Sequence, residues 1–346
     1  MRYIVEVPTA EAAAIEEMVM EGHYASVQQF IETAIQNQLL IQGLPLGRFE
    51  APEAKQGLTG QSSVLRSLPA GQQASLLVRP RNVLVTSAAI SPTRKTIWGL
   101  HNRFFPSKIG LRVLANLAEE LGKEFVDLET TQEEAGKQAR LIGRMLVDYD
   151  DKIGSQHGEK LSTGLPVGKQ DKSLARFSDM FVGFLKSDES AEGLPADLGF
   201  VIIKLETKGN ALIGLTEKGK QFVQLANPVL DRQDNSIPDR TLSEDEADFL
   251  LSHMRTWLPL EWERCQRVLG AISQGENGPD KLDNVLHLKE KHQSLDNIST
   301  ERAGIVSRLT ELGLVRRKRT GLKVTYSLTE RGGQYSNKKR EVGVTS

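Results

Sequence analysis

The stretch that most constrains the fold is residues 299–332, because it specifies a helix, a hairpin and a second helix start in that order. Ser299 or Thr300 can cap the helix, and apolar residues follow at helical spacing, namely Ile305, Val306, Leu309 and Leu312. Gly313 comes next, where a left-handed residue commonly ends a helix. The sequence therefore predicts a short amphipathic helix with a sharp end.

The residues after Gly313 predict two strands joined by a tight turn. Residues 314–317 and 323–328 have strand composition, and residues 319–321 can turn the chain between them. Thr329 then offers a new helix start. This order resembles winged helix-turn-helix domains, in particular regulators of the multiple-antibiotic-resistance type. The resemblance implies a mainly α fold with small β wings, of the α+β class.

A second copy of this pattern is predicted in the middle of the chain. The phrase LIGLTEKGKQF, which contains Thr216, resembles TYSLTERGGQY, which contains Thr329, 113 residues later. Such self-similarity at a distance indicates repeated modules. We therefore expect a first winged-helix-like domain at residues 96–230 and a second at residues 241–335, separated by a polar boundary.

Helix and strand signals occur in both domains. In the first, helices are expected at residues 106–122, 130–147 and 173–186, a loop at 148–172, and strands at 198–205 and 211–215. In the second, Ser243 and Glu246 form a capping box, Pro259 interrupts a long helical run, and a further helix ends near His292.

Residues 1–42 predict a strand followed by two helices. The phrases RYIVEVP and YASVQQFIETAI resemble the ribbon-helix-helix superfamily, that of the Arc and methionine repressors. One short strand and about 40 residues bury too little surface to fold alone. The resemblance therefore implies a homodimer in which two chains pair their strands.

The charge of this N-terminal segment argues against DNA contact. Residues 1–42 contain one basic residue, Arg2, and six glutamates, a net charge of −5. The family's DNA-binding strand face would here carry Arg2, Ile4 and Glu6. Binding to a polyanion requires the opposite sign. Dimerisation is the better supported role, and contact between Arg2 and DNA is the alternative.

Two segments predict no compact structure. Residues 43–95 are rich in Gly, Pro, Ser and Gln, which indicates a flexible linker, either a passive tether or a partner-binding segment. Residues 336–346 form a basic tail with Lys338, Lys339 and Arg340.

Positive charge is concentrated at the C-terminal end of a chain whose net charge is −1. Residues 297–346 contain 11 Lys or Arg and 4 Glu, so their net charge is 11 − 4 = +7. The winged-helix resemblance implies contacts to DNA from the third helix, at Thr300, Arg302, Ser307 and Arg308. It implies further contacts from the wing, at Arg316, Arg317, Lys318, Arg319 and Lys323.

The corresponding candidates in the first domain are fewer. They are Lys172 and Arg176 on the third helix and Lys204 and Lys208 near the wing. In either domain these charges could simply be solvated, and winged helices also serve as protein-binding modules.

No pattern for catalysis or for a bound cofactor or metal emerges. The sequence contains neither a phosphate-binding glycine loop nor a serine nucleophile elbow, and its six histidines are dispersed. A single cysteine, Cys265, cannot form an internal disulfide and favours a reducing compartment. No apolar run approaches about 18 residues, so no membrane span is expected. The sequence predicts a cytoplasmic protein that is not an enzyme.

These features predict a homodimeric DNA-binding protein that regulates transcription, reading double-stranded DNA with winged helices. The alternative is a non-catalytic adaptor that also binds other proteins of a nucleoprotein complex, such as those of plasmid partition, replication, transposition or phage defence.

Overall fold

The computed structural model describes residue 27 and residues 77–87, 95–155, 159–168, 171–206, 209–232, 238–287, 295–321 and 323–336. The chain divides into two compact units, Met1–Leu68 and Pro69–Ser346. Of the first unit only Val27 is described, in a helix. The predicted strand with Arg2, the rest of the ribbon-helix-helix-like segment and the basic tail lie outside the described residues.

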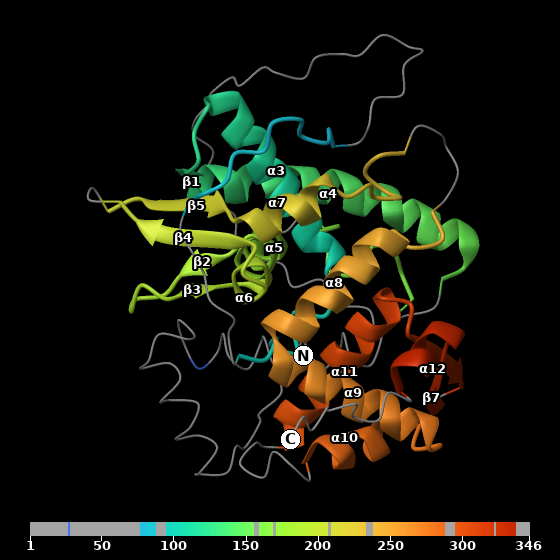
Figure 1. Ribbon diagram of the computed structural model, residues 1–346. Helices are drawn as coiled ribbons and strands as arrows, with labels where there is room; N and C mark the ends of the chain where they lie inside the picture. The colour runs from blue at the N-terminus through green and yellow to red at the C-terminus, as the bar shows by residue number, and fades with distance from the viewer. Residues whose placement is uncertain are drawn as a thin grey trace. The chain divides into compact units, whose positions relative to one another are not determined.

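The second unit is mainly helical with small antiparallel sheets, as expected of the α+β class (Figure 1). Its first module, shown above the second in Figure 1, contains α3 (Phe105–Leu121), β1 (Val126–Asp127), α4 (Leu128–Ile153), α5 (Asp171–Phe181), β2 (Phe184–Leu185), β3 (Ala191–Glu192), α6 (Leu194–Asp197), β4 (Val201–Leu205), β5 (Ala211–Leu215) and α7 (Glu217–Gln224). Strands β1, β5 and β4 form one antiparallel sheet in that order.

Two helix boundaries of the first module differ from prediction. Helix α4 is longer than expected because Asp127 caps it, accepting a hydrogen bond from the Thr130 amide at 2.7 Å. Helix α5 ends at Phe181, not at residue 186, and Gly183, whose φ is 124°, leads the chain into the β2–β3 hairpin. Residue 186 therefore lies beyond the helix on which it was expected.

The second module contains α8 (Glu244–Trp257), α9 (Pro259–Ser273), α10 (Pro279–His287), α11 (Leu295–Glu311), β6 (Val315–Thr320), β7 (Lys323–Leu328) and α12 (Glu330–Ser336). The capping box of Ser243 and Glu246 and the break at Pro259 are confirmed. The predicted caps Ser299 and Thr300 are wrong, because α11 begins at Leu295 and both residues lie inside it.

Thr216 connects the β4–β5 hairpin to the helix that follows it through three hydrogen bonds, an arrangement that we call a threonine corner. The Thr216 amide donates to the Phe200 carbonyl at 3.0 Å, and its hydroxyl donates to the Gly199 carbonyl at 2.7 Å. The same hydroxyl accepts from the Gly219 amide at 3.1 Å, which caps α7. One side chain thus joins both ends of the hairpin to a helix start.

Thr329 builds the same corner in the second module. Its amide donates to the Leu314 carbonyl at 3.0 Å, and its hydroxyl donates to the Gly313 carbonyl at 2.7 Å and accepts from the Gly332 amide at 2.9 Å. The similar phrases around Thr216 and Thr329 therefore adopt matching hydrogen-bond arrangements.

In both modules, backbone from a connection between two helices pairs with the last strand of the hairpin. In the first module β1 pairs with β5, with Val126 opposite Ile213. In the second, Asn277, between α9 and α10, accepts a hydrogen bond from the Tyr326 amide of β7 at 2.9 Å. The likeness of the modules therefore extends beyond their corners.

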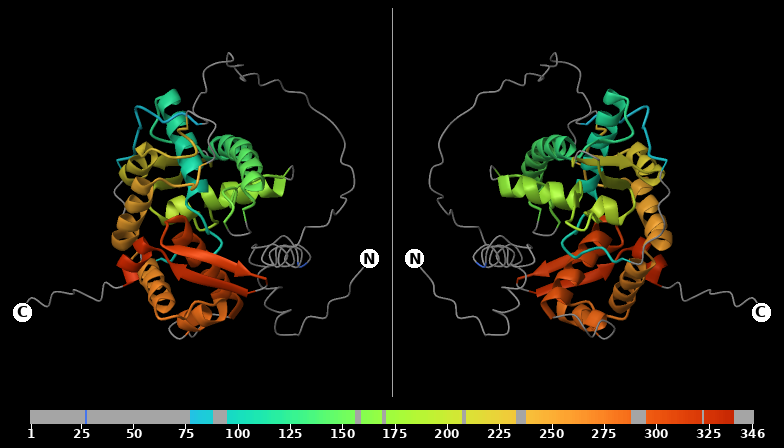
Figure 2. Two further views of the ribbon diagram at one scale, coloured as in Figure 1. Left: turned by 90° about the vertical axis from the view of Figure 1, so that its right-hand side faces the viewer. Right: turned by 90° about the vertical axis from the view of Figure 1, so that its left-hand side faces the viewer.

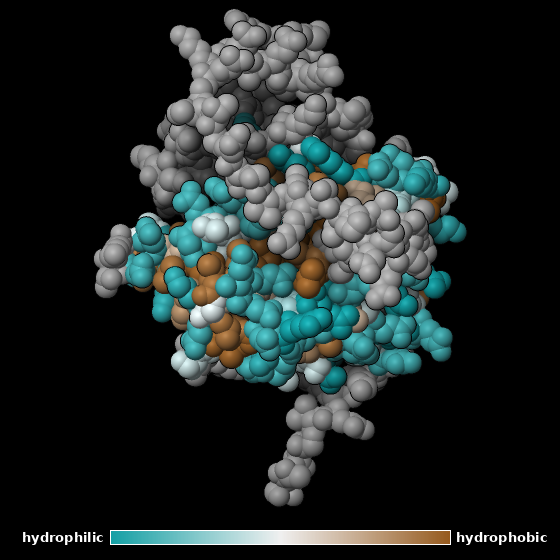
Figure 3. All heavy atoms as spheres, turned by 90° about the horizontal axis from the view of Figure 1, so that it is seen from above, coloured by the Kyte–Doolittle hydropathy of each residue, from teal (hydrophilic) through white to brown (hydrophobic). Residues whose placement is uncertain are grey.

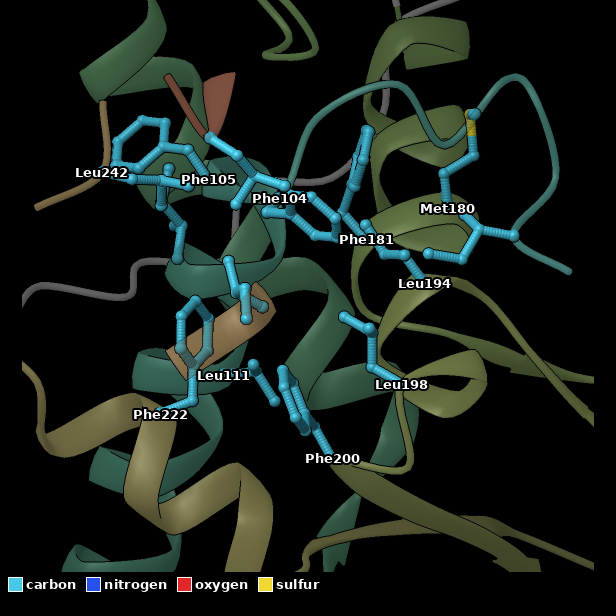
Figure 4. Packing of buried hydrophobic residues seen from close by; sticks show 14 of the residues in the cluster. Phe104, Phe105, Leu111, Met180, Phe181, Leu194, Leu198, Phe200, Phe222 and Leu242 are labelled. Carbon is cyan, nitrogen blue, oxygen red and sulfur yellow. The ribbon is translucent and has the colours of Figure 1, made fainter. Parts of the chain in front are cut away.

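A continuous hydrophobic core extends through both modules. Phe104 and Phe105, at the start of α3, belong to the same buried cluster as Leu242, which precedes α8, and as Phe200 and Phe222 (Figure 4). The two modules therefore share one core.

Buried charges join α3 to the residues that lead into the second module. The Lys108 Nζ lies 2.8 Å from a Glu246 carboxylate oxygen, and both side chains are 0% exposed. Arg112 donates to both Asp231 carboxylate oxygens, at 2.7 and 2.6 Å. Burial lowers the pKa of Lys108 to about 8, although Glu246 opposes the shift. Breaking such a pair is costly, which fixes the modules relative to each other.

Residues 77–87 do not behave as the linker that was predicted. Leu77 and Val83 are buried, and the Glu119 carboxylate of α3 accepts hydrogen bonds from the Arg81 and Asn82 amides at 3.2 and 3.1 Å. This segment belongs to the folded unit because its apolar residues have a place in the core.

On the face seen in Figure 3, hydrophilic residues cover most of the described surface, with hydrophobic residues among them. Among the helices that the structure describes, none is both long and apolar enough to cross a lipid bilayer.

Candidate nucleic-acid interface

The β6–β7 hairpin presents two chemically different faces (Figure 2, red arrows). Because side chains alternate along a strand, the paired residues Arg317 and Tyr326 share a face with Val315, and Tyr326 and Val315 are buried. The opposite, outer face carries three cations and three hydroxyls, namely Arg316, Lys318, Lys323, Thr320, Thr325 and Ser327. We call these six residues the outer face of the β6–β7 hairpin.

The three cations of this outer face are exposed, and they have no partner among the residues that the structure describes. Within the described part of the chain, no hydrogen bond or ion pair engages the side chains of Arg316, Lys318 or Lys323. An unpaired cation on a strand can contact a phosphate without breaking an internal interaction. The outer face is therefore available for a polyanion.

The other two basic residues of the hairpin are partly engaged. Arg317 lies on the inner face, is half-buried and has an interaction of its own. Arg319 is exposed, and its Nε donates to the Gly321 carbonyl at 3.0 Å, which holds the side chain over the turn. Both can add positive potential, but Arg316, Lys318 and Lys323 remain the accessible donors.

The prediction that Arg308 contacts DNA is wrong. Its side chain is 1% exposed and lies between α9 and residues 98–101. It donates to a Glu261 carboxylate oxygen at 2.5 Å and to the His101 carbonyl at 2.7 Å. This arginine stabilises the contact between modules.

Arg302 is also engaged inside the protein. Its Nε donates to the Asp283 carboxylate of α10 at 3.0 Å, and its guanidinium also donates to the Ser299 hydroxyl at 2.9 Å. Its side chain is 13% exposed. The predicted contacts Thr300 and Ser307 are half-buried on the same helix. Of the four predicted contact residues on α11, two are uncharged and the two arginines are engaged in internal ion pairs.

Residues 97–104, here called the crossing segment, cover one face of α11. A Cβ on Gly304 would lie under 3.0 Å from the Gly99 backbone, so the crossing segment and α11 touch backbone to backbone, without side chains between them. The Glu301 carboxylate accepts from the Gly99 amide at 3.0 Å, and the Glu311 carboxylate accepts from the Phe104 and Phe105 amides. The face of α11 with these residues is unavailable to a ligand.

A carboxylate of a second helix, α9, also binds the crossing segment. Glu261 of α9 accepts from the Ile97 amide at 3.2 Å and also binds Arg308. Burial raises the pKa of Glu301 and of Glu311, and Arg264 and Arg103 respectively oppose these shifts. The segment is therefore fixed by buried acceptors, for which the sequence carried no recognisable signal.

The candidates in the first module are scattered. Lys172 and Arg176 are exposed on α5, and the Arg176 Nε approaches the Met180 sulfur at 3.4 Å. Lys204 is exposed on β4, but its Nζ lies over the Phe125 ring, 3.6 Å from the centroid. Lys208 lies outside the described residues, as does Arg2.

Among the described candidates, three cations share one exposed face only on the β6–β7 hairpin. The sequence analysis did not predict the hydroxyl residues Thr320, Thr325 and Ser327 as site residues, although the strand pattern places them on the same face as Arg316, Lys318 and Lys323.

In the described ranges, no three His, Cys, Asp or Glu side chains gather as a metal site would require.

No protein-family model, curated protein or solved structure matches this chain.

Proposed function

We propose that this chain is a non-catalytic protein that binds double-stranded DNA with the outer face of its β6–β7 hairpin and regulates transcription. The observation that carries the proposal is the row of unpaired cations, Arg316, Lys318 and Lys323, flanked by hydroxyls on one exposed face. Cations and hydroxyls are the groups with which proteins contact phosphates.

The order of elements supports the proposal. In the first module α3, β1, α4 and α5 precede the β4–β5 hairpin, with the β2–β3 hairpin and α6 inserted before it, and the sheet order is β1-β5-β4. Apart from that insertion this order resembles the one proposed for a winged helix, and the second module has the same threonine corner and a comparable backbone pairing at Asn277. The proposal includes homodimerisation through residues 1–42, on the ribbon-helix-helix resemblance.

The decisive experiment reverses two charges on the hairpin. We expect Arg316→Glu with Lys318→Glu to weaken duplex binding at least a hundredfold at 0.1 M salt, because two attractive groups become repulsive. The matched control is Lys123→Glu with Lys137→Glu, which makes the same charge change on exposed residues of the first module. Fluorescence anisotropy gives the affinities, and thermal melting and mass measurement check fold and oligomer.

Equal affinity of the hairpin variant and the native chain would refute this function. Equal weakening by both variants would show that net charge, and not the hairpin, determines binding.

A second candidate is an adaptor in a nucleoprotein complex. The Trp98 side chain favours it, because this large ring is 52% exposed although its backbone is fixed against α11. Exposed tryptophans are enriched where proteins bind one another. Duplex binding that strengthens on addition of a partner, and loses this gain in Trp98→Ala, would select the adaptor.

A further inference from the structure

We infer that this protein binds duplex DNA by its sugar-phosphate backbone and with little preference for base sequence. The inference rests on the proposed function, since it concerns how the outer face of the β6–β7 hairpin engages DNA. It departs from the expectation that Thr300, Arg302, Ser307 and Arg308 of α11 contact the DNA.

The arginines of α11 are unavailable for base recognition. Arginine supplies the commonest specific base contact, through bidentate hydrogen bonds to guanine. Withdrawing Arg308 would remove the 2.5 Å partner of the fully buried Glu261 carboxylate and leave it the longer ion pair with Arg264 at 3.8 Å. Breaking a buried ion pair is strongly destabilising, so Arg308 stays inside. Arg302 is likewise tied to Asp283 and Ser299.

The remaining surface of α11 offers little base discrimination. The crossing segment covers the face of Glu301, Gly304 and Glu311. Over residues 298–311, the face away from the core and from that segment carries small uncharged residues, namely Ser299, Ala303, Ser307 and Thr310. Serine and threonine hydroxyls bind more than one base, so they select weakly.

The hairpin, by contrast, has the composition of a backbone-binding surface. Arg316 and Lys318 are two residues apart on β6, which spaces them about 6.7 Å along the strand, and Lys323 lies across from Thr320. Phosphate contacts fix position and carry no direct sequence information. Three such contacts predict a slope of log affinity against log salt of about −2.7 for each hairpin bound. Affinity should then fall about fortyfold between 50 and 200 mM salt.

The test selects binders from a random duplex pool with the full-length chain. After several rounds we expect no enriched sequence motif and an affinity within about threefold of the starting pool. An enriched motif bound at least a hundredfold more tightly would overturn the inference while leaving the proposed function standing. Absence of binding to any duplex would overturn both.

Paired variants separate the hairpin from the helix. Lys318→Gln should weaken binding to every duplex about fivefold to tenfold and reduce the salt slope by about 0.9. Ser307→Ala and Thr310→Ala should leave the affinity for every duplex within twofold of the native value. A loss of tenfold or more for one duplex alone in either helix variant would show that α11 reads bases, and would overturn the inference. Lys123→Gln controls for the loss of one exposed positive charge.

Discussion

The two hairpins of this protein end in the same kind of threonine corner, but the side chains on their strand faces differ in chemistry. Thr216 and Thr329 make the same three kinds of hydrogen bond at the ends of β4–β5 and β6–β7. Among the paired residues of β4–β5, one face carries Ile202, Leu212 and Gly214 with Lys204 as its only charge, and Gly214 is buried. The outer face of the β6–β7 hairpin carries cations and hydroxyls. The corner is thus a structural requirement, and the strand surface can vary with function.

The helices that follow the corners are also held differently. Lys108, which is fully buried, donates to the carbonyls of Phe222 and Leu225 at the end of α7. In the second module, Arg331 at the start of α12 donates to Asp248 at 2.6 Å, and both side chains are partly exposed. The first corner is therefore anchored in the core, and the second at the surface.

The largest effects should come from the glycines inside the corners. A Cβ on Gly219 or Gly332 would lie under 3.0 Å from the carbonyl oxygen of Phe200 or Leu314, and that backbone cannot move freely. We expect Gly219→Ala and Gly332→Ala each to lower the free energy of unfolding by about 3 kcal/mol. Denaturant titration measures both.

Gly333 provides a matched control for this prediction. It is the next residue of α12, and nothing lies within 4 Å of a Cβ placed there. Gly333→Ala should therefore raise stability by up to about 1 kcal/mol through helix propensity. If Gly332→Ala were as harmless as Gly333→Ala, the two corners would not be equivalent.

Much of this comparison could be predicted from the sequence, because local signals determine local structure. The Thr-Glu-basic-Gly runs, the capping box at Ser243 and the break at Pro259 each depend on near neighbours in the chain. Alternation along residues 315–328 also predicts which charges share a face. These signals sufficed for the hairpins and for the α+β class.

The burial of the α11 arginines in internal ion pairs could not be predicted from such local signals. Arg308 is buried because Glu261, 47 residues earlier, and the crossing segment, more than 200 residues earlier, meet it in space. A basic residue at a regular helix position has the same sequence signature whether it faces solvent or a buried carboxylate. The net charge of +7 therefore overstated the charge that is free to bind DNA.

The next largest effect is a change in the free energy of unfolding with pH, which tests how Lys108 anchors the first corner. The pKa of Lys108 is about 8 in the folded chain and 10.5 for an unperturbed lysine. Because the folded pKa is lowered, charged Lys108 costs stability below pH 8, and this cost disappears as the pH rises towards 10.5. The free energy of unfolding should gain up to about 1 kcal/mol per pH unit within that window from this group alone.

Two variants isolate that contribution. Lys108→Met combined with Glu246→Gln removes both charges and keeps an acceptor for the capping box, so the pH-dependent gain should vanish. Arg331→Gln, at the second corner, should cost less than about 1 kcal/mol and leave the pH slope unchanged, because its ion pair is partly exposed. A slope that survives in the double variant would contradict the assignment to Lys108.

Smaller losses are expected from the corner threonines themselves. Thr216→Ala and Thr329→Ala each remove a helix cap and a hydrogen bond to a glycine carbonyl, which should cost about 1–2 kcal/mol. Thr216 is buried and Thr329 half-buried, so the first loss should be the larger. Serine at either position keeps the hydroxyl and should restore most of the stability in thermal melting. A serine variant as unstable as the alanine variant would show that the hydroxyl is not what the corner needs.

The smallest effect should come from Lys204, the one cation on the paired strands β4 and β5, and it bears most directly on function. The Lys204 Nζ lies over the Phe125 ring, so Lys204→Gln should lower stability by about 0.5–1 kcal/mol. It should leave duplex affinity and its salt dependence within experimental error, whereas Lys318→Gln on the second hairpin should change both and leave stability unaltered. Anisotropy and melting on the same two variants test this double dissociation. Equal losses of affinity would mean that both hairpins meet DNA, and that the difference between their surfaces is not the basis of binding.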